Sequence, residues 1–375
     1  MTGPTRFVYL DHNATTPVRD VAAAAVAEMS RHVGNPSSVH RAGRAARQRL
    51  EAARNKVARA IVLPGGGTLV FTSGGTEANA LALAGTGRRR ILRSSTEHDS
   101  VRAAAPALEI AVTMDGLVDP AALDAALAES GEPALVSVMA ANNETGVIQP
   151  IASLAARAHA AGALVHCDAI QAIGKIGFDM AALGLDMVSV SAHKFGGPPG
   201  IGALALAPGL HLAALQRGGG QERGMRAGTE NLPGIAGFAA AIEAAVAELD
   251  SFAELTARRD AMERTLQGIA PESVLFGTGA PRLPNTCCVA LPGVASELQV
   301  MALDLAGIGV SAGAACSSGK VRPSHVLEAM GASPELARSA IRISLGRDTT
   351  EQDIARLVEA WSTLVRRHRE KRGAV

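Results

Sequence analysis

The segment MVSVSAHKFGGPPGIG, residues 187–202, runs from an apolar, β-branched stretch into a lysine and then into a loop rich in glycine and proline. Between about Thr16 and Asp250, similar short runs alternate with alanine-rich stretches of helical character. The expected strands include TLVFTS (68–73), RRILRSS (89–95), ALVSVMAA (134–141), ALVHCDA (163–169) and IGALAL (201–206), and the expected helices lie at 41–60, 76–84, 120–129 and 151–161. This alternation is typical of βα units around a largely parallel sheet, whose ligands bind beyond the carboxyl ends of the strands.

The pattern changes after about Asp250. A long helical stretch is followed by short apolar runs, NTCCVAL (285–291), GIGVSAG (307–313) and AIRISLG (340–346), with helical segments between them and after them. The 375 residues leave room for a second unit, because a typical domain has about 150 residues. We therefore expect a large domain over residues 15–250 and a smaller α+β domain that combines residues 1–14 with 251–375.

The composition indicates a globular protein without a strong charge bias. The 36 Lys and Arg residues against 35 Asp and Glu give a net charge of +1, and aromatic residues make up 2% of the chain. Nucleic-acid binding is therefore not expected, since it relies on basic patches and aromatic stacking. The uncharged stretch 195–216 contains three prolines and five glycines, which a membrane helix rarely tolerates, so we expect no membrane span.

The cysteines and the first residues bear on the compartment. Cys167, Cys287, Cys288 and Cys316 follow no CxxC pattern, which argues against a zinc site or a disulfide scaffold and for a reducing compartment. The start, MTGPTRFVYLDHNATTP, lacks the layout of a signal peptide. We expect a cytoplasmic protein with no resident metal.

A candidate anion site follows the expected strand TLVFTS. Gly75 and Thr76 stand at the start of the next helix, where free amides, the Thr76 hydroxyl and the helix dipole favour a phosphate. The segment is neither a P-loop nor a dinucleotide fingerprint. The alternative is an ordinary turn between a strand and a helix.

Two charged residues at strand ends point to a specific cofactor. Lys194 leaves a buried strand, and desolvation there lowers the pKa of an amine and makes it nucleophilic. Asp168 closes another apolar strand, and a carboxylate in the same cleft can keep a pyridine nitrogen protonated. Taken alone, Lys194 could be a lysine whose amine reaches solvent at the end of a strand, and Asp168 could be a helix cap. Together with the phosphate site, the order along the chain is the one expected for pyridoxal phosphate.

Cys316 differs in setting from the other cysteines. It lies in SAGAACSSG (311–319), a run of small residues that favours a flexible loop bringing one thiol to solvent. Cys287 and Cys288 lie in an apolar run and are expected in the core. We therefore expect Cys316 to be the reactive thiol.

With these segments identified, the chain resembles the cysteine desulfurases, which are fold-type-I pyridoxal-phosphate enzymes. The resemblance covers nearly the whole chain and favours the branch with the longer cysteine loop. The matching segments are YLDHNATTP (9–17), GNPSS (34–38), TSGGTEAN (72–79), TEH (96–98), NNETG (142–146), DAIQ (168–171), SAHK (191–194), GGGQERGMRAGTEN (218–231), SAGAACSSG (311–319) and IRISLGR (341–347). The resemblance implies an α/β fold in which a mainly parallel, seven-stranded sheet flanked by helices is joined to a smaller α+β domain.

The resemblance also implies roles for individual residues. Lys194 would form the Schiff base with pyridoxal phosphate, Asp168 would pair with the ring nitrogen, and His98 would stack on the ring and assist proton transfer. The phosphate would be bound by Gly75, Thr76, Ser191 and His193, and by Thr229 from the partner subunit of a homodimer. Gln171 would face the ring hydroxyl, and Asn143 would orient cofactor and substrate. Arg342 would bind the substrate carboxylate. The alternatives are a loop histidine for His98, a glycine-rich surface loop around Thr229 and a structural ion pair for Arg342.

The expected reaction converts L-cysteine to L-alanine and leaves a persulfide on Cys316. The sulfur would pass to an acceptor protein, a scaffold or a sulfur carrier, for iron–sulfur clusters or for thiolation of transfer RNA, and Cys316 is a candidate transient ligand of such a cluster. A selenocysteine lyase or another pyridoxal-phosphate lyase or aminotransferase is the alternative within the enzyme class. A non-catalytic partner that kept the fold is the alternative outside it, and the presence of Lys194, Asp168, His98 and Cys316 argues against it.

Overall fold

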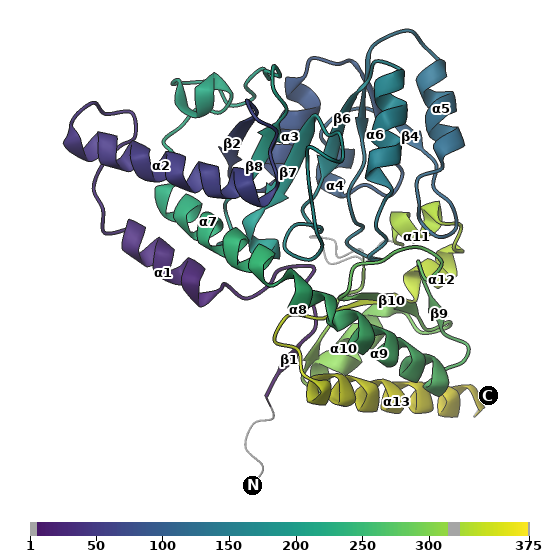
Figure 1. Cartoon of the computed structure of the whole chain (residues 1–375). Coiled ribbons are helices and arrows are strands. Elements are labelled where there is room, and N and C mark those ends of the chain that lie inside the picture. The colour runs from purple at the N-terminus through teal and green to yellow at the C-terminus, as the bar shows by residue number, and fades with distance from the viewer. Residues whose placement is uncertain (1–5, 314–322, 374–375) are drawn as a thin grey trace.

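A computed structural model describes residues 6–313 and 323–373 of the chain, without the side chains of 371–373. Its larger part is built on a seven-stranded sheet (Figure 1). The strand order is β2 (Thr68–Thr72), β8 (Gly202–Leu206), β7 (Met187–Ser191), β6 (Leu164–Asp168), β5 (Ala134–Ser137), β3 (Arg90–Ser94) and β4 (Leu108–Ile110). β8 is antiparallel to both of its neighbours, and the other pairs are parallel.

Helices cover both faces of this sheet, which explains why β7 is buried along its whole length and shows no polar alternation. Val188 and Val190 pack in one core with α2 and α7, while Met187 packs in the other core with α3. The helices of this part are α1 (Asp20–Met29), α2 (Arg41–Ala60), α3 (Gly75–Gly85), α4 (Asp99–Arg102), α5 (Pro120–Ala128), α6 (Ile151–Ala160) and α7 (Leu232–Ala247), with short 3-10 turns η1 (Ala192–Lys194) and η2 (Gln221–Gly224).

The smaller part has its own cores around a three-stranded antiparallel sheet of order β12 (Ala340–Ser344), β10 (Thr286–Ala290) and β9 (Val274–Leu275). The N-terminal strand β1 (Val8–Tyr9) pairs with β11 (Ile308–Gly309), so the beginning of the described chain packs with this part. Its helices are α8 (Leu249–Ala253), α9 (Leu255–Ile269), α10 (Ser296–Leu305), α11 (His325–Ala329), α12 (Pro334–Arg338) and α13 (Glu351–Gly373). The domain boundaries at 14/15 and 250/251 stay a prediction.

The predicted α/β fold with a mainly parallel sheet is confirmed. The expected strand over 134–141 ends earlier, at Ser137. Beyond it, Val138 N and Ala140 N still donate to His166 O and Asp168 O, so the chain follows β6 outside the regular strand. The strand β4 was not predicted: it has three residues, and Glu109 interrupts the apolar residues around it.

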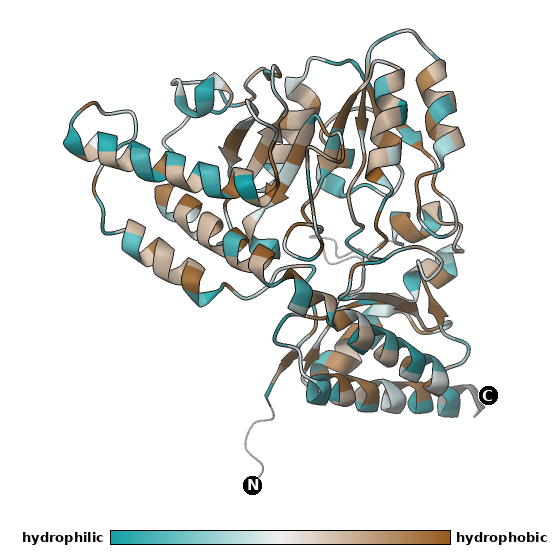
Figure 2. Cartoon of the chain, in the orientation of Figure 1, coloured by the Kyte–Doolittle hydropathy of each residue, from teal (hydrophilic) through white to brown (hydrophobic). Residues whose placement is uncertain are grey.

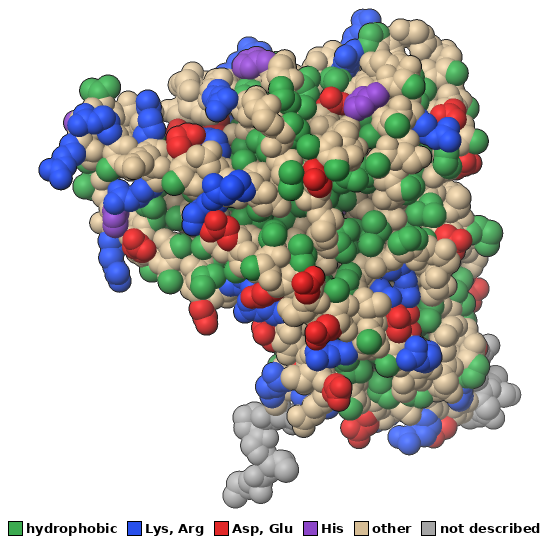
Figure 3. All heavy atoms as spheres, viewed as in Figure 1, with side chains coloured by type: hydrophobic (Ala, Val, Ile, Leu, Met, Phe, Trp, Pro, Cys, Tyr) green, Lys and Arg blue, Asp and Glu red, His purple; other side chains and the backbone are tan. Residues whose placement is uncertain are grey.

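The surface agrees with the balanced composition. Figure 2 shows largely hydrophobic strands and helices such as α2 and α13 that alternate hydrophilic and hydrophobic residues. Figure 3 shows basic and acidic side chains interspersed over the face in view. In the part of the chain that the structure describes, no single helix is long and apolar enough to cross a membrane; α7 with Leu249–Ile269 passes that test only as a pair bent by 65°.

Candidate active site

One cavity of about 340 Å³ lies where β6 and β7 end and the smaller part of the chain meets the large sheet. We call it the central cavity. Ten of the twelve predicted site residues line it: Gly75, Thr76, His98, Asn143, Asp168, Gln171, Ser191, His193, Lys194 and Arg342. They come from strand ends, helix starts and loops that are far apart in the sequence, as expected for an α/β sheet.

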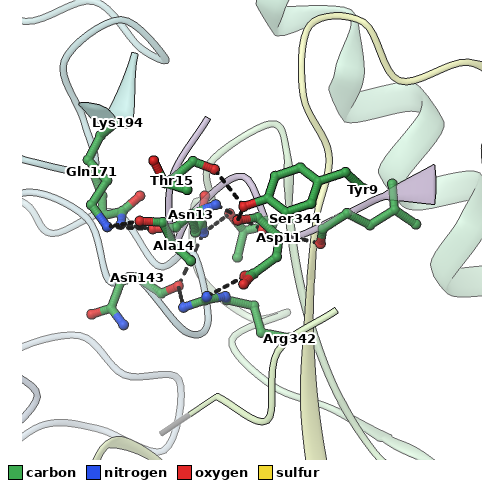
Figure 4. A network of polar contacts seen from close by, with 12 residues as sticks. Tyr9, Asp11, Asn13, Ala14, Thr15, Asn143, Gln171, Lys194, Arg342 and Ser344 are labelled. Carbon is green, nitrogen blue, oxygen red and sulfur yellow. Dashed lines mark hydrogen bonds and ion pairs between the residues drawn. The ribbon is translucent and has the colours of Figure 1, made fainter. Parts of the chain in front are cut away.

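Lys194 occupies the last position of η1, directly after β7. Its Nζ donates hydrogen bonds to Asn13 O (2.7 Å) and Ala14 O (2.9 Å) (Figure 4). Burial chiefly, and then the charge of Arg342, lower the pKa of Lys194 to about 8, against the opposing effect of nearby carboxylates. A large fraction of this amine is therefore neutral slightly above physiological pH, which nucleophilic attack and proton removal both require.

Asp168 is the last residue of β6 and is buried. Its Oδ2 accepts from Asn79 Nδ2 (2.8 Å), and its Oδ1 accepts from Ile170 N (3.0 Å). The hydrogen bond from Ile170 N is the kind of contact expected if Asp168 caps the segment that follows it, the alternative given above. A carboxylate has about four lone-pair positions, however, so two contacts leave capacity for a pyridinium N–H.

The predicted phosphate site lies at the start of α3. A Cβ at Gly75 would lie 2.2 Å from Ile170 Cδ1, so only glycine fits there without movement of Ile170. The first amides of a helix have no acceptor within the helix, and Ser191 and the partly buried His193 line the same cavity. Burial chiefly, with the charges of Lys194 and Lys175, lowers the pKa of His193 to about 4, so this ring is a neutral N–H donor at physiological pH.

His98 is the N-cap of α4 and is exposed at the cavity. Its Nδ1 accepts from Ser100 N (3.1 Å) and lies 2.8 Å from Ser100 Oγ. Since Nδ1 accepts from the backbone, the proton of the neutral ring is on Nε2. The ring is therefore fixed at one end and has a single exchangeable proton at the other.

Arg342 lies in β12 and its side chain is 5% exposed. Its guanidinium donates to Asp11 Oδ1 (2.6 Å) and to Asn143 O (3.1 Å), as Figure 4 shows. The ion pair with Asp11 is the structural role that the sequence leaves as the alternative for Arg342. Arg342 lines the central cavity, and its Nε is buried without a partner among the described residues.

Asn13 connects these groups and was not singled out from the sequence. Its backbone oxygen accepts from Lys194 Nζ and from Gln171 Nε2 (2.9 Å), and its Nδ2 donates to Asn143 O (3.1 Å) (Figure 4). Its backbone N–H donates to Ser344 Oγ in β12 (2.9 Å). Asn13 thus ties the large sheet to the smaller part. Its place in YLDHNATTP was a signal, but spacing along the chain does not reveal such a network.

Two predicted site residues are not in the central cavity. Thr229 is exposed and lines a separate cavity of about 230 Å³ with Thr72 and Ser73, the residues that precede the phosphate site. The structure therefore does not bring Thr229 to the cavity of its own chain. Cys316 lies outside the described residues.

The residues present fit pyridoxal phosphate. Helix amides and Ser191 can bind a phosphate, Asp168 has lone pairs for a ring nitrogen, and Lys194 is an amine of lowered pKa. The cysteines that the structure describes, Cys167, Cys287 and Cys288, are free and buried. Within residues 6–313 and 323–373, no group of three or more His, Cys, Asp and Glu side chains is arranged to bind a metal.

The comparisons with known proteins show the family of the chain. The model of the aminotransferase class-V family matches residues 8–357. A cysteine desulfurase of Cereibacter sphaeroides is 45% identical over 373 residues, covering 96% of this chain and 95% of that protein. The cysteine desulfurase IscS of Dictyoglomus turgidum is 40% identical, covering 97% of this chain and 96% of that protein. The chain belongs to the aminotransferase class-V family of pyridoxal-phosphate enzymes and, within it, to the cysteine desulfurases.

Solved structures lead to the same family. A NifS-like protein from Rickettsia africae superimposes with a TM-score of 0.89 at 34% identity, covering 96% of this chain and 99% of that one. A structure described as SspA in complex with cysteine has a TM-score of 0.75 at 27% identity, covering 92% of this chain and 100% of that one. The predicted family and fold are thereby confirmed.

The lowered pKa of Lys194 gives a prediction for the cofactor-free chain. Lys194 should react with an acylating reagent with a midpoint near pH 8, since only the neutral amine attacks and burial with Arg342 holds its pKa at about 8. Arg342→Gln should move the midpoint up, because it removes a positive charge that favours the neutral amine. Peptide mass spectrometry after labelling across a pH series measures both, with the surface residue Lys56 as internal control. A wild-type midpoint near the ordinary value of 10.5 would contradict this prediction.

Proposed function

We propose that this cysteine desulfurase converts L-cysteine to L-alanine in the central cavity and transfers the sulfur to Cys316. The observation that supports this most is the convergence of Lys194, Asp168 and Arg342 in one cavity of about 340 Å³. An amine, a carboxylate and a guanidinium are the groups needed to bind the cofactor and an amino acid substrate. The cysteine bound in the similar SspA structure is consistent with this substrate.

Pyridoxal phosphate, when bound, withdraws electrons from the substrate carbon skeleton. Gly75, Thr76, Ser191 and His193 would bind its phosphate, Asp168 its ring nitrogen and Gln171 its ring hydroxyl. Asn143 would orient cofactor and substrate, with its backbone oxygen already fixed by Asn13 and Arg342. His98, at the cavity with its proton on Nε2, is suited to lie against the ring.

The chain's own groups account for the proton and sulfur transfers. Neutral Lys194 removes the Cα proton of L-cysteine, and His98 can pass a proton through Nε2. The Cys316 thiolate attacks the substrate sulfur as the Cβ–S bond breaks, and the electron pair stays with the carbon skeleton. The balance is one cysteine and one enzyme thiol giving one alanine and one enzyme persulfide.

The proposed carboxylate site can be tested by removing the charge of Arg342. Arg342→Gln should raise KM for L-cysteine by about 10–100-fold, because hydrogen bonds to a charged group contribute about 1.5–3 kcal/mol and 1.4 kcal/mol is a factor of ten. Cysteamine lacks the carboxylate, so its much weaker binding as a competitor should be nearly unchanged by the substitution. Alanine release measures the first effect, with Arg369→Gln at a surface ion pair as control. An equal loss of cysteamine affinity would indicate that Arg342 acts only as a structural partner of Asp11.

We also propose that the active enzyme is a homodimer in which Thr229 contacts the phosphate bound by the partner subunit. In support, Thr229 is exposed and lies outside the cavity of its own chain. Thr229→Val should lower the affinity for pyridoxal phosphate about tenfold, the effect of one hydrogen bond to a charged group. Sedimentation tests the dimer independently. A sedimentation mass of one chain at working concentration would contradict the role of Thr229 across an interface.

The acceptor and the compartment are further parts of the proposal. We propose transfer of sulfur to a scaffold or carrier protein for iron–sulfur clusters or for thiolation of transfer RNA, since an enzyme persulfide needs an acceptor. The free thiols of Cys167, Cys287 and Cys288 are consistent with a reducing cytoplasm. The relatives named above are cysteine desulfurases, which favours this activity over a selenocysteine lyase or an aminotransferase.

A further inference from the structure

Lys175 is a buried lysine near the central cavity, and the reaction described above does not use it. It is 4% exposed and follows the turn after β6. A buried amine is stable only with hydrogen-bond partners. Lys175 Nζ donates to Gln171 Oε1 (2.5 Å) and to Asn13 Oδ1 (2.7 Å). Gln171 and Lys175 lie four residues apart in the turn that follows β6, and the hydrogen bond between them brings their side chains together.

The contact with Lys175 determines which end of the Gln171 carboxamide faces which neighbour. A lysine ammonium only donates, so the carboxamide atom beside it is the oxygen. On the other side, Gln171 Nε2 donates to Asn13 O (2.9 Å), which only accepts. Both neighbours therefore select one orientation of an amide that could otherwise rotate by half a turn.

This orientation leaves a donor for the cavity. Gln171 is 4% exposed and lines the central cavity. Its amide nitrogen has two hydrogens, and the structure gives one of them an acceptor among the described residues. The opposite orientation would present an oxygen, which repels the oxygen of a hydroxypyridine in its anionic form.

The charge state of Lys175 is compatible with this arrangement. Burial chiefly, and then the charges of Lys194 and Arg342, hold the pKa of Lys175 well below its ordinary value. The neighbouring groups that titrate are His12 and His193, and the charge of Lys175 contributes to the lowered pKa of both rings. A neutral amine keeps two N–H groups, one for each observed contact, but also has a lone pair that can accept. Since Asn13 O only accepts and takes Gln171 Nε2, the oxygen of the carboxamide still faces Lys175, and Lys175 donates to it in either state.

We propose that Lys175 is a positioning residue that acts through Gln171: its amine fixes the carboxamide so that Nε2 donates to the ring hydroxyl oxygen of the cofactor. This proposal rests on the proposed binding of pyridoxal phosphate in the central cavity. It adds a residue that the cofactor itself does not touch.

The test compares two probes, pyridoxal phosphate and its analogue without the ring hydroxyl. Apparent dissociation constants are measured by equilibrium dialysis for the wild type, Lys175→Met and Lys56→Met, a control at a surface ion pair. Lys175→Met should lower the wild-type preference for pyridoxal phosphate over the analogue about tenfold, because one charge-assisted hydrogen bond is lost or weakened. Lys56→Met should leave that preference unchanged. The interaction of the ring hydroxyl with the Schiff base is present in every protein and cancels in this comparison.

Lys175→Arg is the second variant, which keeps the test valid if Lys175→Met does not fold. It keeps a group that only donates, and the cavity of about 30 Å³ beside Lys175 offers some space for the larger side chain. Lys175→Arg should restore most of the preference. An unchanged preference in folded Lys175→Met, or an equal loss of affinity for both probes, would overturn the proposal. If the wild type binds neither probe through Lys194, the proposed function itself is wrong, which is a different result.

Discussion

Lys194→Ala is expected to lower kcat for alanine release from L-cysteine by about 10³-fold or more, because a single amine both holds the cofactor and removes the Cα proton. In the described part of the chain, Lys194 is the lysine that lines the central cavity. The fold should persist, since the substitution removes the hydrogen bonds to Asn13 O, which Gln171 Nε2 still donates to, and to Ala14 O beside an open cavity.

A small amine separates the chemical role of Lys194 from a structural one. Added methylamine should restore part of the turnover of Lys194→Ala, because it can enter the space of the lost side chain and act as a base. Lys56→Ala, which breaks a surface ion pair with Glu243, serves as the matched control and should keep wild-type turnover. Turnover of Lys194→Ala above about a tenth of the wild type would be incompatible with the proposed base.

Cys316→Ala is expected to stop sulfur transfer while the chain still binds L-cysteine. The thiol is the proposed acceptor of the substrate sulfur, so alanine release should fall about 10³-fold or more without it. The absorbance change when L-cysteine is added should remain, since Lys194, Asp168 and Arg342 are intact. An aminotransferase has no use for this thiol, so full activity in Cys316→Ala would support that alternative.

Cys288→Ala is the control for this substitution. Cys288 is 1% exposed in β10, and burial, together with nearby Glu144, raises the pKa of its thiol above the ordinary value. Such a thiol is not a nucleophile at physiological pH. Cys288→Ala should therefore keep turnover and change stability only, as thermal unfolding can measure.

The parts of the fold that the sequence predicted are those with strong local patterns. The helix over 41–60 was predicted with the bounds of α2, and the buried run 187–191 forms β7. The three-residue strand β4 was missed, because it is short, Glu109 interrupts its apolar residues, and its pairing with β3 is a tertiary contact. Tertiary contacts, not local sequence, determine such edge strands.

The site shows the same division. Lys194 and Asp168 could be found from the sequence because each stands at the end of an apolar strand. Asn13 contacts Lys175 and Ser344, both more than 100 residues away along the chain, so spacing could not reveal its place at the site. The pairing of Arg342 with Asp11 likewise joins residues 331 positions apart, which no spacing rule indicates.

The most direct test of the proposed function is the mass of the Cys316 peptide after brief exposure to L-cysteine without reductant, with released alanine counted in the same sample. We expect one added sulfur on that peptide, none in Cys316→Ala, and one alanine for each sulfur. Alanine without sulfur on Cys316 would contradict the proposed nucleophile, and the absence of both products would contradict the proposed reaction.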